Sequence, residues 1–134
     1  MNSVSTTGTF ANDGQPYAGQ TKTYIPQDHG SCPVDCDWTG PTAVTVQAIE
    51  VLLSQPGLTA AERTTYTNLR NSMADYLEGN AIRNIAAAAW GAQRLSYALV
   101  AMVAAGRTPA NNANALAIRN RILALGGAAN TGWG

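Results

Sequence analysis

The sequence predicts a mainly α-helical protein, with about four helices in a compact bundle preceded by a long extended N-terminal arm. Alanine, the strongest helix former, accounts for 24 of the 134 residues and clusters after position 41. In the same region apolar residues recur three and four positions apart, which is typical of amphipathic helices. Glycine and proline are frequent in the first forty residues, so no helix is expected to propagate there.

The length and charge favour one domain with three segments. A chain of 134 residues fits a single domain. We therefore divide it into an extended polar and aromatic arm (1–40), a helical bundle (41–127) and a flexible tail that contains Trp133 (128–134). The formal net charge is zero, and 46% of the residues are hydrophobic. This balance excludes a wholly disordered chain and argues against a strongly basic nucleic-acid-binding protein.

The arm carries aromatic and apolar residues that a simple linker lacks. Residues 21–25 alternate weakly and predict one short strand. Such side chains need an apolar surface, either on the chain's own helices or on a neighbouring molecule. Together with Trp133, these residues are the candidate interface residues: Phe10, Tyr17, Tyr24 and Ile25.

The first two helices are expected at 41–55 and 59–78. Pro41 suits the first position of a helix. A broad apolar face follows, made of Val44, Ala48, Ile49, Val51, Leu52 and Leu53. Thr59 and Glu62 have the spacing of a capping box, which predicts the start of the second helix. A helix-packing seam follows, consisting of Tyr66, Leu69, Met73, Tyr76 and Leu77.

The last two helices are expected at 80–105 and 109–125. Gly79 is expected to end the second helix and Asn80 to cap the third. The third helix is apolar nearly all round, which predicts a central position with Trp90 in the core. Pro109 is expected to open the fourth helix. Its predicted buried stripe contains Leu116, Ile118, Ile122, Leu123 and Leu125.

The residues most able to perform chemistry lie between positions 29 and 37. His29, Cys32 and Cys36, with Asp35 or Asp37, are of the types that bind zinc, although their spacing is not that of a standard zinc finger. Cys32 and Cys36 are instead able to form a strained short disulfide in an oxidising compartment. The third alternative is two reduced thiols in a turn. All three alternatives remain open at this stage.

Catalysis, membrane insertion and sequence-specific nucleic-acid binding are not expected. The helical region lacks histidine, a phosphate-binding loop and a nucleophile elbow, so we assign no catalytic residue and no cofactor other than possible zinc. Residues 1–10 are polar, so no signal peptide is expected. The apolar stretch 85–105 is interrupted by Arg94, which favours a buried helix over a membrane span.

These features lead to an expectation of a structural subunit. Only 12% of the residues are charged, about half the usual share, and such a surface suits permanent contact with other subunits. Residues 1–40 carry net charge −3 and residues 41–134 carry +3, so the two parts are expected to attract each other, either within one chain or between neighbours that exchange arms. We expect a coat, cement or connector protein of a virus-like or filamentous particle, with copies of itself or other particle proteins as partners. The location would then be a virion or another extracellular particle. The alternatives are a metal- or thiol-centred binding module at 29–37 and a secreted helical effector.

Overall fold

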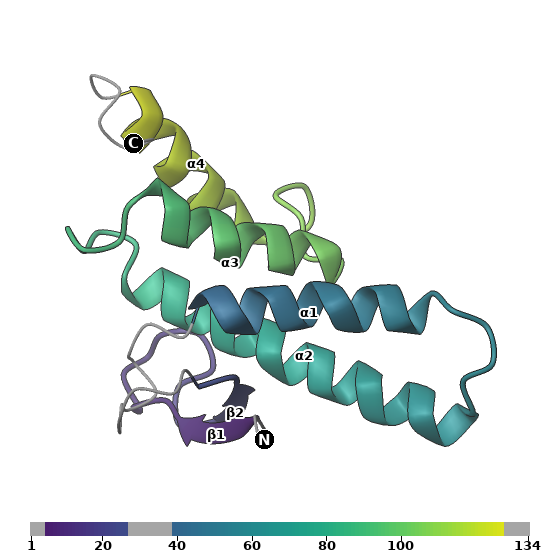
Figure 1. Ribbon diagram of the computed structural model, residues 1–134. Coiled ribbons are helices and arrows are strands. Elements are labelled where there is room, and N and C mark those ends of the chain that lie inside the picture. The colour runs from purple at the N-terminus through teal and green to yellow at the C-terminus, as the bar shows by residue number, and fades with distance from the viewer. Residues whose placement is uncertain (1–4, 27–38, 128–134) are drawn as a thin grey trace.

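The described part of the chain contains four helices and a small two-stranded sheet (Figure 1). This structure is a computed structural model that describes residues 5–26 and 39–127. In chain order the elements are β1 (Thr6–Thr9), β2 (Thr21–Tyr24), α1 (Thr39–Leu53), α2 (Ala60–Arg83), α3 (Ala92–Ala104) and α4 (Ala113–Gly127). The predicted number of helices is confirmed, and three of their predicted boundaries need correction.

The helices pack around α2 and α3. Figure 1 shows α1 and α3 side by side and running in the same direction, with α2 antiparallel to both and α4 returning along α3. The seam predicted for the second helix lies in the core, where Met73, Tyr76 and Leu77 are fully buried. Trp90 is buried as predicted. Removing these side chains from water is the main source of stability for such a bundle.

The N-terminal segment is a hairpin rather than an extended arm over the described residues. β1 and β2 pair antiparallel, with Thr6 opposite Tyr24 and Thr9 opposite Thr21. The hairpin packs on α2, where Tyr76 lies between two aromatic rings. The ring centroid of Phe10 lies 6.1 Å from that of Tyr76, and the centroid of Tyr24 lies 5.1 Å from it. The strand predicted at 21–25 is confirmed, whereas its partner β1 was not foreseen, because its Thr-Thr-Gly-Thr sequence shows no alternation.

The capping box predicted for the second helix is present. The Glu62 amide donates to the Thr59 hydroxyl at 3.1 Å, and the Thr59 amide donates to the Glu62 carboxylate at 2.9 Å. Each side chain therefore satisfies one amide that has no partner inside the helix.

Gly79 does not end α2, which continues to Arg83, so the predicted boundary at 78–80 is wrong. A Cβ atom at position 79 would lie 2.9 Å from the Phe10 ring, so the glycine provides the close approach between helix and hairpin. Asn80 lies inside the helix and donates to the Tyr76 hydroxyl rather than acting as a cap. The helix ends at Asn84, whose side chain donates to the carbonyl of Asn80.

The third helix is shorter than predicted, because residues 84–91 form turns instead of its first half. The Ala87 amide donates to the Asn84 carbonyl, and the Trp90 amide donates to the Ala87 carbonyl. A continuous helix through this alanine-rich stretch would form one long rod with α2. The break allows α3 to fold back onto α1 and α2, and the resulting burial outweighs the helix propensity of alanine.

The fourth helix starts at Ala113 rather than at Pro109. Residues 108–111 form a turn in which the Thr108 amide donates to the Asn111 side chain. Asn112 then accepts a hydrogen bond from the Ala115 amide at 2.8 Å, which is the geometry of an N-terminal cap.

Candidate functional site

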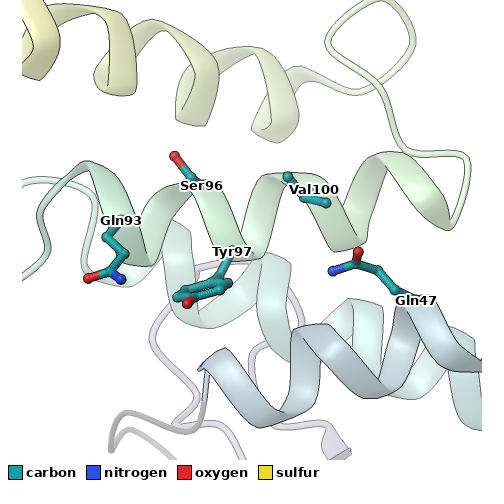
Figure 2. A pocket seen from close by; sticks show the side chains of 5 residues that line it. All are labelled: Gln47, Gln93, Ser96, Tyr97 and Val100. Atoms are coloured by element: carbon teal, nitrogen blue, oxygen red, sulfur yellow. The ribbon is translucent and has the colours of Figure 1, made fainter. Parts of the chain in front are cut away.

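A hollow lies between α1 and α3 on the surface of the bundle. Its volume is about 330 Å³, and it is lined by Gln47 of α1 and by Gln93, Ser96, Tyr97 and Val100 of α3. Figure 2 shows Gln47 extending from α1 towards α3, and Tyr97 extending from α3 towards α1. The lining contains amide, hydroxyl and apolar groups but no charged side chain, so the hollow favours an uncharged occupant.

Exposed apolar side chains continue the rim of this hollow along both helices. On α1, Val44 and Val51 lie three residues before and four after Gln47 and are 59% and 63% exposed. On α3, Val100 is 51% exposed and Val103 follows one turn later. We call this surface the α1–α3 face and define it by Val44, Gln47, Val51, Tyr97, Val100 and Val103.

Two of the apolar helix faces identified in the sequence are only partly covered in the structure. The apolar side of α1 is only half buried: Ile49 lies in the core, whereas Val44, Ala48 and Val51 face solvent. On α4, Ile118 and Ile122 are buried as predicted. Leu116 and Leu123, predicted to share their stripe, are 40% and 53% exposed. Periodicity correctly identified apolar rows but did not show which of them a neighbouring helix covers.

A second cluster contains charged groups and lies where the hairpin, α2 and the α3–α4 connection meet. Nη1 of Arg107 lies 2.6 Å from Oδ1 of Asp75 and donates at 3.0 Å to Oε1 of Glu78. Nζ of Lys22 lies 2.6 Å from Oδ2 of Asp75. The side-chain amide of Asn114 donates to Oε2 of Glu78 at 2.7 Å. Only 3% of Glu78 is exposed, so its carboxylate depends on these partners in place of water.

The electrostatics of this cluster follow from its burial. Burial by itself lowers the pKa of Arg107, but the charge and hydrogen bond of Asp75, aided by Tyr17 and Glu78, outweigh that effect and raise it. Every charged group in the cluster has an oppositely charged partner within the chain. The arrangement therefore fastens three parts of the fold together.

Tyr17 is a second hairpin residue, besides Lys22, in the charged cluster. Its φ of 63° lies in the left-handed region, which bulky residues rarely adopt, at a cost on the order of 1–3 kcal/mol. Its hydroxyl donates to Oε1 of Glu78 at 3.2 Å and accepts from Arg107 at 3.2 Å. Burial raises the pKa of Tyr17, and the nearby carboxylates of Glu78 and Asp75 raise it further. The strained backbone places a neutral phenol between the ions.

Another ion pair joins the hairpin to the end of α2. Arg83 donates from Nε and Nη2 to the two carboxylate oxygens of Asp13, at 2.8 and 2.9 Å, and its guanidinium lies 4.0 Å from the ring centroid of Phe10. The hydrogen bond from Arg83 lowers the pKa of Asp13. The attraction expected between the acidic N-terminal part and the basic helical part is thus seen within one chain.

Four of the five predicted interface residues make contacts inside the chain. Phe10 and Tyr24 are buried in the core, and Ile25 packs against it. Tyr17 joins the charged cluster. Trp133 lies outside the described residues, as do all members of the predicted metal or disulfide site: His29, Cys32, Asp35, Cys36 and Asp37.

The described ranges contain no candidate metal centre and no membrane-spanning helix. Within residues 5–26 and 39–127, no group of three or more histidine, cysteine, aspartate or glutamate side chains is placed to hold a metal ion. In those same ranges, no helix combines the length and the apolar character needed to cross a bilayer.

Comparisons with known proteins assign the chain to no family. No protein-family model, no curated protein and no solved structure matches the chain. Any function must therefore be argued from the chain's own surface and core.

Proposed function

We propose that the protein is a non-enzymatic assembly subunit, such as a coat, cement or connector protein of a virus-like or filamentous particle. One observation carries the proposal: large apolar side chains are exposed on three of the four helices. They are Val44, Val51, Tyr97, Val100, Val103, Leu116 and Leu123. Apolar surface on this scale in a chain with 12% charged residues favours contact with other protein surfaces.

The nature of the buried polar groups supports the same proposal. Asp75, Glu78 and Arg107 are largely shielded from bulk water by their neighbours, and each is held by a partner within the chain. A catalytic group needs access to substrate and freedom to exchange a proton. These groups instead stabilise the attachment of the hairpin, which suits a permanent structural role.

The sequence predicted that the N-terminal segment joins the chain to its neighbours, and the structure limits how it is able to do so. Phe10 and Tyr24 are buried against α2, so they are not free anchors for a neighbour. Exchange of hairpins between copies would preserve these contacts, because domain swapping replaces each contact by an identical one in the neighbouring molecule. A connecting role for this segment therefore requires exchange.

Sedimentation velocity over a wide range of protein concentration tests the proposal. We expect species larger than a monomer that grow with concentration, and regular particles when the concentrated sample is viewed by electron microscopy. A discrete, folded monomer at every concentration up to the millimolar range would refute it and would favour the secreted effector. Stoichiometric zinc that is lost in Cys32→Ser, in a protein that stays monomeric, would instead favour the metal-binding module.

A further inference from the structure

The α1–α3 face has the chemistry of a surface that pairs with another uncharged surface. α1 contains a single charged residue, Glu50, and α3 contains a single one, Arg94. Glu50 forms an ion pair with Arg70 of α2. The Arg94 guanidinium lies 5.9 Å from the ring centroid of Trp90. Neither charged side chain is therefore available on this face to orient a charged partner. Such a partner would lose hydration there without gaining a counter-ion.

The face is large enough to form the centre of a dimer contact. The two helices contain 15 and 13 residues, so the face is about 20 Å long, and two adjacent helices make it about 20 Å wide. A ridged surface of that outline carries several hundred Å² of accessible area. A standard protein–protein interface takes about 800 Å² from each partner, so this face supplies the centre of such a contact and the flanking surface supplies the rest.

The face also contains both halves of a self-complementary contact. In a two-fold contact the same patch must supply each projecting group and the space that receives it. Here Val44 and Val51 project on either side of a hollow of about 330 Å³. The hollow is lined in part by Gln47 and Gln93, whose amides both donate and accept hydrogen bonds and so are able to pair with their own copies.

We propose that the α1–α3 face binds a second copy of this chain, in a two-fold contact that places α1 and α3 of each copy against those of the other. The inference rests on the proposed assembly function and adds to it the surface that makes the first contact. It assigns the exposed part of the apolar side of α1 to burial in the dimer.

Charge substitutions on and off the face test this inference. Val51→Glu and Val100→Glu place a carboxylate at exposed positions of the face, where neither perturbs the core. Thr64→Glu places the same charge at an exposed position of α2 outside it and serves as the control. Circular dichroism establishes that all three variants keep the helical content of the parent protein. We expect both face variants to raise the dimer dissociation constant by at least about 100-fold, because carboxylates brought together without counter-ions oppose association, and Thr64→Glu to leave it within about threefold.

The outcomes separate this inference from the proposed function. A parent protein that is monomeric at every concentration overturns both. A parent protein that associates, with both face variants associating as Thr64→Glu does, overturns the dimer contact and leaves the assembly function intact. In that case Leu116→Glu and Leu123→Glu show whether α4 makes the contact instead. Loss of association in the face variants alone supports the inference.

Discussion

Replacing Arg107 by methionine removes the cation on which the buried charged cluster depends. Arg107 lies 2.6 Å from Asp75 and donates to Glu78, Tyr17 and the carbonyl of Asn71. Methionine preserves much of the apolar stem and removes the charge. Asp75 keeps Lys22 as a partner, whereas Glu78 loses the one cation that pairs with it among the described residues.

The structure gives the expected size of this effect. Removing one partner of a buried ion pair costs about 3–5 kcal/mol, because the remaining charge stays desolvated. The Glu78 side chain is 4% exposed and that of Arg107 is 19% exposed, so water reaches the arginine more readily than the carboxylate. The Tyr17 hydroxyl and the side-chain amide of Asn114 still donate to Glu78. We therefore expect a loss of about 3 kcal/mol, at the lower end of that range.

A double-mutant cycle measures whether the pair itself causes the loss. The free energy of unfolding is measured by urea denaturation at pH 7 for the parent protein, Arg107→Met, Glu78→Gln and the double variant. We expect Glu78→Gln to cost about 1–2 kcal/mol, since Arg107 keeps Asp75, and the double variant to lose less than the sum by about 1–3 kcal/mol. Arg119→Met removes an exposed arginine of α4 and should change stability by less than about 0.5 kcal/mol. Additive losses, or a loss below about 1 kcal/mol for Arg107→Met, would refute the role assigned to the cluster.

The remaining predictions concern single contacts. Thr59→Ala should lower the free energy of unfolding by about 1 kcal/mol in urea denaturation, because it removes the α2 cap; an unchanged value would contradict that cap. Gly79→Ala should cost about 1–3 kcal/mol and lower the thermal midpoint, because its Cβ would lie 2.9 Å from the Phe10 ring. Gly40→Ala, with no atom within 4 Å, should be neutral or stabilise by up to about 1 kcal/mol. Since the pKa of Tyr17 is raised above 10.0, the unfolded chain loses that phenolic proton first, and stability should fall as pH rises above 10. Tyr17→Phe should make this alkaline fall less steep, and identical pH profiles would show that the phenol does not contribute.

Local patterns predicted the parts of the fold that neighbouring residues in the chain control. The capping box at Thr59 and the seam containing Met73 and Tyr76 were predicted correctly, because both depend on residues within one or two helical turns. The end of α2 was predicted wrongly at Gly79. Glycine is a helix terminator by local preference, but here it admits the ring of Phe10, which lies 69 positions earlier in the sequence.

The candidate site was less predictable than the fold. Sequence reasoning placed Val44 and Val51 on an apolar side of their helix, but not at the surface. It also did not foresee the cluster around Glu78, whose members are far apart in sequence and of types common on solvated helices. A signal was present in the near absence of charged residues from α1 and α3, since surface helices of a monomer usually carry several.

The sequence by itself determined the helical class, the number of helices and the residues able to form a core, because backbone propensity, capping and apolar spacing act over a few residues. Only the tertiary structure decided which apolar rows are covered, where the alanine-rich stretch turns, and that the N-terminal segment folds back on α2. Those outcomes depend on contacts between distant segments, such as Phe10 with Gly79 and Tyr17 with Arg107. The packing of the whole chain fixes such contacts, and no local pattern records them.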